Sequence, residues 1–114
     1  MQYIYDFQQP FELISEGVDH QIVFCYECQL YHVQYGPISL DLSDTGIQML
    51  MNAMAYNLVI YDGLIDASER CIEVEIPTMR TYLTLSIQEL HQLRELLQHA
   101  RQTFHERLRI RRSN

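Results

Sequence analysis

Hydrophobic and polar residues alternate along several short stretches of this chain, as is typical of strands with one buried face. The clearest stretch is 72–76, where Ile72, Val74 and Ile76 alternate with two glutamates. The sequence predicts two strand pairs and one edge strand: Leu30–Tyr35 with Ile38–Leu42 around Gly36-Pro37, Cys71–Ile76 with Arg80–Leu85 around Pro77-Thr78, and Ile22–Cys25 at the edge.

Two longer segments space their apolar residues by three and four, which is the period of a helix. The first segment begins at Ser43 and ends near Asn57, and the second begins at Ser86 and ends near Arg109. Each serine suits an N-cap, because its hydroxyl accepts a hydrogen bond from an amide of the first turn. Ser86 is followed by Glu89, so the second helix also has a capping box.

The order strand, strand, helix occurs twice, and Leu40–Ser43 matches Leu83–Ser86 in its pattern of apolar, polar, apolar and Ser. We expect an α+β fold, with an antiparallel sheet of four or five strands, two helices packed on one face and a ββα internal repeat. A hydrophobic content of 47% suits one core, so we expect a single domain. Its expected parts are an N-terminal extension (1–21), a first ββα half (22–57), a connecting loop (58–70) and a second ββα half with an Arg-rich end (71–114).

Charge is divided unevenly along the chain, whose net charge is -7. The first 69 residues contain ten acidic residues and no arginine or lysine, whereas the rest contains eight arginines against five acids, a net charge of +3. We expect the Arg-rich end to pair with the acidic half and with the helix dipole. The basic residues concerned are Arg107, Arg109, Arg111 and Arg112. The overall negative charge does not favour nucleic acid as a partner.

Four glycines stand isolated in the chain, so phosphate-binding glycine loops and the Gly-x-Ser-x-Gly nucleophile motif are missing. The sequence therefore indicates no catalytic residues, and we expect no enzyme activity. The longest apolar runs are far shorter than the roughly 20 residues that cross a bilayer. The first residues have neither the charge nor the apolar run of a signal peptide, which favours a cytoplasmic protein without a membrane partner.

Cys25 and Cys28 form a Cys-x2-Cys pair, with His32 four residues later and His20 five residues earlier. Two thiolates at this spacing reach one zinc ion, and two imidazoles would complete a tetrahedron. Two other interpretations stay open, namely buried cysteines without a function and a redox pair. Strand-like sequence around the pair weakens the redox interpretation, because catalytic Cys-x2-Cys pairs begin a helix. Zinc is thus the one cofactor that the sequence suggests.

The second helix has a narrow apolar seam of the kind that two packed helices bury between them. Its residues are Leu90, Leu93, Leu97, Ala100 and Phe104. The helix spans roughly 36 Å and outreaches strands of about 20 Å. One apolar face does not say whether its partner is the sheet, the first helix or another subunit. Because the seam continues through Ala100 and Phe104, past the expected end of the sheet, we expect it to form the contact of a homodimer.

The Cys25 and Cys28 pair, the Ile76-Pro77-Thr78 turn and the Leu83–Ser86 segment resemble those of a family of small uncharacterised proteins from Bacteroidetes bacteria, a domain of unknown function. The resemblance covers Ile22 to Leu97 and leaves the Arg-rich end outside it. It implies no activity, substrate or catalytic residue. Together these patterns predict a non-enzymatic protein-interaction module that acts as a homodimer with an unknown protein partner. The alternative is a small zinc-binding protein that uses Cys25 and Cys28.

Overall fold

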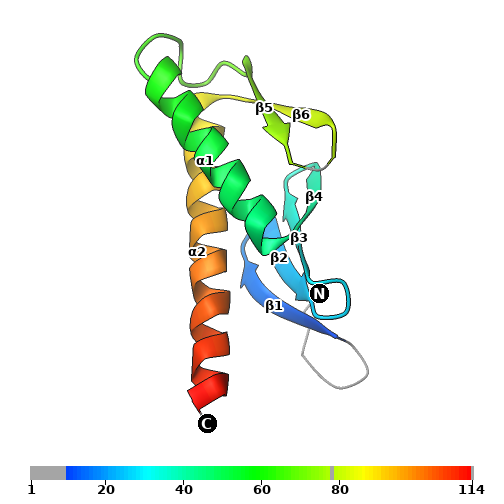
Figure 1. Cartoon of the computed structure of the whole chain (residues 1–114). Coiled ribbons are helices and arrows are strands. Elements are labelled where there is room, and N and C mark those ends of the chain that lie inside the picture. The colour runs from blue at the N-terminus through cyan, green and yellow to red at the C-terminus, as the bar shows by residue number, and fades with distance from the viewer. Residues whose placement is uncertain (1–9, 78, 114) are drawn as a thin grey trace. The chain divides into compact units, whose positions relative to one another are not determined.

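A computed structural model of the chain describes residues 10–77 and 79–113. The elements in chain order are β1 (Phe11–Glu16), β2 (His20–Cys25), β3 (Leu30–Tyr35), β4 (Ile38–Leu42), α1 (Asp44–Tyr61), β5 (Ile72–Ile76), β6 (Thr81–Leu85) and α2 (Ile87–Ser113) (Figure 1). This composition confirms the α+β class, and the order strand, strand, helix occurs twice as predicted. None of the helices in the described part of the chain is long and apolar enough to cross a membrane.

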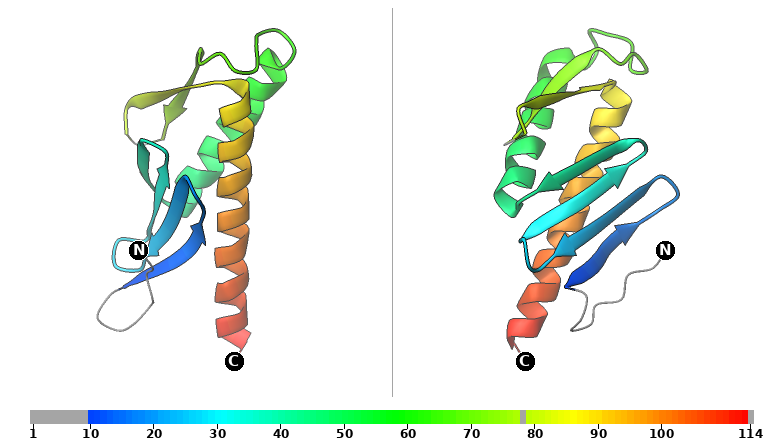
Figure 2. Two further views of the ribbon diagram at one scale, coloured as in Figure 1. Left: turned by 180° about the vertical axis from the view of Figure 1, so that it is seen from behind. Right: turned by 90° about the vertical axis from the view of Figure 1, so that its right-hand side faces the viewer.

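The first four strands form an antiparallel sheet in the order β1-β2-β3-β4, so each strand pairs with its neighbour in the chain (Figure 2). A tight turn joins β3 to β4 at Gly36, whose φ of 55° is easily adopted by glycine. β5 and β6 pair with each other in a separate two-stranded sheet. An antiparallel sheet of four strands is therefore present, as expected, but β5 and β6 form a second sheet instead of joining it, because local turns specify each hairpin but not which hairpins join.

β1 lies within residues 1–21, which we had predicted to be an extension, and it pairs with β2 from Phe11 opposite Cys25 onward. The first nine of those residues lie outside the described ranges. The strand escaped prediction because one of its two inward positions is charged: Glu12 and Ile14 are both only 6% exposed. A buried glutamate removes the alternation by which a half-buried strand is recognised.

The chain divides into two compact units. Of the described residues, the first unit contains those up to Asp44 together with those from His99 onward, and the second unit contains those between Thr45 and Gln98. The first unit therefore includes β1 to β4 and the second half of α2, whereas the second includes nearly all of α1, both strands of the small sheet and the first half of α2. This division does not follow the two successive ββα halves, and the single domain stays a prediction.

Aromatic side chains form the core of the first unit around Phe104 of α2. The ring of Phe104 stacks on Phe24 of β2 at a centroid distance of 4.2 Å and meets the edge of Tyr31 of β3 at 5.6 Å. Phe24 and Tyr31 also contact each other edge to face, at 4.9 Å. These contacts pack the second half of α2 against one face of the four-stranded sheet.

The second unit confirms the predicted start of α2. The backbone N–H of Ser86 donates to the Glu89 carboxylate, and the N–H of Glu89 donates to the Ser86 hydroxyl, as in a capping box. Further along, the Arg94 side chain donates to the carbonyl of Met51, which links α2 to α1 within this unit. α1 buries six residues: Gly46, Ile47, Leu50, Met51, Met54 and Leu58.

The apolar seam predicted on α2 is buried in the single chain. Its exposed fractions are 0% for Leu90, Leu93, Leu97 and Ala100 and 4% for Phe104. These side chains already have packing partners within the chain, so a second copy would have to bind another surface. The homodimer itself stays a prediction.

Candidate metal centre

The turn between β2 and β3 brings Cys25, Cys28 and His32 together. Cys25 is the last residue of β2, and Cys28 lies in the four-residue turn that follows it. The turn closes through Gln29, which has a positive φ of 57° and whose side chain donates to the Tyr26 carbonyl. Cys25 pairs with Leu30 across the hairpin, so His32, two residues further along β3, lies on the same face of the sheet as Cys25.

The ligand atoms of Cys25, Cys28 and His32 all lie within 4.8 Å of one another, which is close enough to hold one metal ion. Cys28 Sγ is 3.8 Å from His32 Nε2, and the Cys28 backbone N–H donates to Cys25 Sγ at 3.3 Å. Tetrahedral zinc with ordinary bond lengths would separate two sulfurs by about 3.8 Å and sulfur from nitrogen by about 3.6 Å. Little movement is needed to reach that geometry.

Asp41 of β4 orients the imidazole of His32. The register of β3 and β4 places Asp41 directly opposite His32, and the Asp41 carboxylate hydrogen bonds to His32 Nδ1. With Nδ1 protonated towards Asp41, Nε2 is left to face the sulfur atoms. This is the arrangement in which a carboxylate fixes the tautomer of a metal-binding histidine and raises its basicity.

The three groups also shift one another's pKa values. Burial raises the pKa of the Cys25 thiol, but hydrogen bonds from Cys28 and His32 outweigh it, and the net pKa is lowered. The pKa of Cys28 is raised, first by its hydrogen bond with Cys25. Burial lowers the pKa of His32, but the hydrogen bond to Asp41 and the proximity of Cys25 raise it overall. Of these two cysteines, Cys25 is therefore the one more ready to act as a thiolate ligand.

His20, the fourth predicted ligand, does not join this group. It begins β2, whereas Cys25 ends it, so the two residues are about 16 Å apart along an extended strand. His20 instead hydrogen bonds to Ser15 at 3.2 Å and lies 3.5 Å from the Asp19 carboxylate. The structure thus brings together three of the four predicted ligands, and Asp41 is the site residue that sequence reasoning missed.

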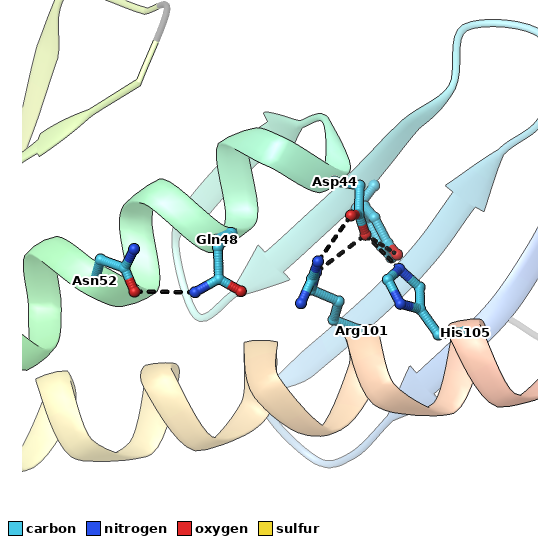
Figure 3. Close-up of polar contacts among 6 residues, drawn as sticks. Asp44, Gln48, Asn52, Arg101 and His105 are labelled. Atoms are coloured by element: carbon cyan, nitrogen blue, oxygen red, sulfur yellow. Dashed lines mark hydrogen bonds and ion pairs between the residues drawn. The ribbon is translucent and has the colours of Figure 1, made fainter.

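A second polar cluster surrounds Asp44 (Figure 3). Arg101 donates two hydrogen bonds to this carboxylate, at 3.1 Å and 3.0 Å, and His105 and Tyr31 contact the same Oδ1 at 2.7 Å and 3.1 Å. Burial alone would raise the pKa of Asp44, but Arg101 and His105 lower it. Each of the polar side chains in this cluster has a partner, so the cluster holds α2 against the sheet of the first unit and leaves no ligand site.

Two of the four arginines of the Arg-rich end, Arg107 and Arg111, pair with an acid of the first half of the chain, as the charge pattern predicted. Arg107 and Arg111 each donate to the carboxylate of Glu12, at 2.9 Å and 2.6 Å, and Tyr26 donates to the same group at 2.6 Å. The Glu12 side chain is 8% exposed. These arginines neutralise a buried acid.

Comparison with known proteins gives one match. No curated protein and no solved structure matches this chain. Residues 7–114 match the Family of unknown function (DUF6686). The match includes the Arg-rich end, which the resemblance noted in the sequence did not cover. Among the residues that carried that resemblance, Thr78 is not in the part of the chain that the structure describes. The Bacteroidetes origin stays a prediction, whereas the match over nearly the whole chain establishes that this protein belongs to the DUF6686 family of unknown function.

Proposed function

We propose that this protein binds a zinc ion through Cys25, Cys28 and His32. The observation that carries the proposal is the convergence of three ligand atoms within 4.8 Å, with His32 Nδ1 held by Asp41. In the described residues these side chains are the one group with such geometry. The carboxylates of exposed acidic residues often lie this close together without binding a metal. Two thiols, an imidazole and an orienting carboxylate form a more specific combination.

Zinc fits these ligands better than other abundant divalent ions. Thiolate and imidazole ligands select zinc over magnesium and calcium, which prefer oxygen. Zinc binding requires both thiols to lose a proton: the lowered pKa of Cys25 favours that loss, and the raised pKa of Cys28 opposes it. All three cysteines are free thiols, and free thiols persist in reducing compartments, which supports the cytoplasm as the location of the protein.

The test is the metal content of protein purified without a chelator or a histidine tag. We expect about one zinc per chain, most of it lost in Cys28→Ser, because the serine hydroxyl is a poor zinc ligand. Cys71→Ser is the matched control, since Cys71 is also an exposed free cysteine but lies outside the cluster. Protein without zinc that also takes up none when zinc is added, or equal occupancy in wild type and Cys28→Ser, would refute the proposal.

The contact between Asp41 and His32 gives a separate prediction. Asp41→Asn should weaken zinc binding about 10-fold to 100-fold, because the amide does not supply the charge that raises the basicity of His32. Competition with a coloured zinc chelator measures the change. Asp19→Asn, beside the histidine that lies outside the cluster, should leave the affinity unchanged. Equal affinities for the two variants would show that Asp41 does not support the site.

Homodimer formation is the second candidate function, and we propose α1 as its surface. Residues 45–61 of this helix contain no charged side chain, although 20% of the chain is charged. Several large apolar residues of the helix are exposed, among them Met49 (54%), Tyr56 (68%) and Val59 (84%). The exposed face of a surface helix is ordinarily polar or charged. On this face of the helix, Gln48 donates a hydrogen bond to Asn52 (Figure 3).

A second copy of the chain is the partner that suits this face. Two copies that each carry a charge of -7 repel one another, and a helix face without charge is where they approach at least cost. The face is also self-complementary, as a twofold interface requires. The smaller residues Asn52 and Ala53 lie between Met49 and Tyr56. A twofold axis of the dimer that passes beside Asn52 and Ala53 would therefore place Met49 of each copy against Tyr56 of the other.

Sedimentation at about 50 μM tests this proposal. We expect wild-type dimers, and we expect Tyr56→Glu to weaken the dimer at least 10-fold, since it would place an unpaired charge against Met49 of the other copy in an apolar contact. Tyr82→Glu on β6, a residue 59% exposed and outside α1, should remain dimeric. A wild-type monomer at this concentration, or equal dissociation of both variants, would contradict association through α1.

A further inference from the structure

We infer that Cys28 is the residue at which a hydroperoxide oxidises this protein, and that Cys25 then closes a disulfide with it and releases the zinc. The inference rests on the proposed zinc site and adds how that site gives up its metal. It follows from the difference in exposure between the two cysteines, the short distance between their sulfur atoms and the acidic residues beside them.

The two cysteines differ in exposure. Cys28 is exposed in the turn after β2, whereas Cys25 is only 4% exposed. A dissolved oxidant therefore reaches the sulfur of Cys28 first. Cysteines that respond to peroxides are solvent-accessible thiolates with a second cysteine nearby, and bound zinc would hold Cys28 as the thiolate. The exposed cysteine is thus the nucleophile, and the buried one closes the disulfide.

The disulfide requires the two sulfur atoms to meet. They lie within 4.8 Å of each other, and the backbone nitrogen of Cys28 is 3.3 Å from Cys25 Sγ. The bond between two sulfurs is about 2.05 Å long. Cys28 lies in the turn, outside the paired residues of β2 and β3. Rotation of its side chain with a small adjustment of the turn therefore closes the gap while the two strands stay paired.

The reaction consumes one hydroperoxide per site. The Cys28 thiolate attacks one peroxide oxygen: an S–O bond forms, the O–O bond breaks, and the leaving oxygen takes a proton to become an alcohol, or water in the case of hydrogen peroxide. The Cys25 thiolate then attacks the sulfur of Cys28, so that an S–S bond forms and the S–O bond breaks. The hydroxide that leaves takes a second proton and becomes water. The two cysteines lose two electrons, and the peroxide gains them.

The disulfide no longer holds the metal. Cysteine binds a metal as the thiolate, and a disulfide has no thiolate. Of the three ligands only His32 would remain, and one imidazole holds zinc weakly. Oxidation and zinc release therefore occur together. A response that happens once per zinc ion does not need the helix that accompanies catalytic Cys-x2-Cys pairs.

Acidic residues beside the pair favour an uncharged oxidant. Glu27 lies exposed between the two cysteines, Asp41 hydrogen bonds to His32, and the chain carries a net charge of -7. These charges repel an anionic oxidant such as glutathione disulfide. Hydrogen peroxide is small and neutral, so it approaches Cys28 without this repulsion.

The test follows zinc and the disulfide together in zinc-loaded Cys71→Ser protein, in which the two cysteines of the site are the ones that remain. A small excess of hydrogen peroxide should release about one zinc per chain to a coloured chelator, whereas protein without peroxide should keep its zinc. Mass spectrometry of the digested protein should find Cys25 linked to Cys28. Dithiothreitol followed by fresh zinc should restore the loaded protein. Zinc that stays bound, or release without this disulfide, would overturn the inference.

Single-cysteine variants test which sulfur reacts first. Both are made on the Cys71→Ser background, freed of metal and treated with peroxide at about pH 10, above the ordinary thiol pKa of about 8.5, so that exposure decides the rate. In Cys25→Ser the sulfenic acid of Cys28 should be trapped by dimedone. In Cys28→Ser the buried Cys25 should be labelled at least 5-fold more slowly. Equal labelling would refute Cys28 as the reacting residue. Protein that takes up no zinc before peroxide is added would refute the zinc site, whereas loaded protein that keeps its zinc under peroxide would refute the inference alone.

Discussion

Phe104→Ala is expected to lower the free energy of unfolding by about 3–5 kcal/mol, which is a large part of the 5–15 kcal/mol typical of a domain. Phe104 is 4% exposed and its ring contacts both Phe24 and Tyr31. Removal of the ring takes apolar area from the core and also ends aromatic contacts worth about 0.5–1.5 kcal/mol each. The measurement is the urea midpoint followed by circular dichroism.

Two further variants make the result interpretable. Gln102→Ala changes an exposed position of the same helix and should alter stability by less than about 0.5 kcal/mol. Phe104→Leu keeps most of the volume and should cost about 1–2 kcal/mol, so a measurable value remains if the alanine variant does not fold. Equal urea midpoints for Phe104→Ala, Phe104→Leu and Gln102→Ala would mean that α2 does not pack on the sheet through the ring of Phe104.

The hairpins and helices could be predicted because each is specified by neighbouring residues. The strands Leu30–Tyr35 and Ile38–Leu42 lie where the alternation and the Gly36-Pro37 turn place them. The start of α2 follows from the Ser86 and Glu89 capping box. In each case the residues that determine the structure are only a few positions apart, so local pattern and final structure agree.

The missed features depend on residues far apart in the chain. Glu12 conceals β1 because its buried charge is stabilised by Arg107 and Arg111, nearly a hundred residues later. The burial of the α2 seam is likewise a long-range result, since nothing in a helical pattern says what covers it. In a single sequence, ion pairs between such distant residues are visible only as an uneven distribution of charge along the chain.

The metal site depends partly on neighbouring residues and partly on residues further apart in the chain. The Cys-x2-Cys spacing and the histidine four residues later are local, and the turn brings all three together. Asp41 becomes visible only once β3 and β4 are paired in register, which puts it opposite His32. His20 is only five residues from Cys25 in sequence, but in an extended strand five residues span about 16 Å. Sequence spacing considered without secondary structure therefore predicts too many metal ligands.

The buried Glu12 should make the protein sensitive to acid. Burial alone would raise the pKa of Glu12, but hydrogen bonds from Tyr26, Arg107 and Arg111 outweigh it and hold that pKa below its ordinary value. Because the folded-state pKa lies below the unfolded one, this group stabilises the fold fully above the unfolded pKa. The stabilisation is then lost as the pH falls through the folded-state pKa.

Glu12→Gln is therefore expected to cost about 2–3 kcal/mol at pH 7, because hydrogen bonds to a charged group are replaced by weaker ones and both arginines lose their counter-charge. The difference from wild type should shrink steadily below about pH 5, as protonation removes the same charge from the wild-type protein. Urea unfolding between pH 3 and pH 8 measures both curves. Glu106→Gln, which removes an equal charge from an exposed position on α2, should follow the wild-type curve. A constant difference between wild type and Glu12→Gln across this range would mean that the charge of Glu12 does not stabilise the fold, and that packing alone explains the loss.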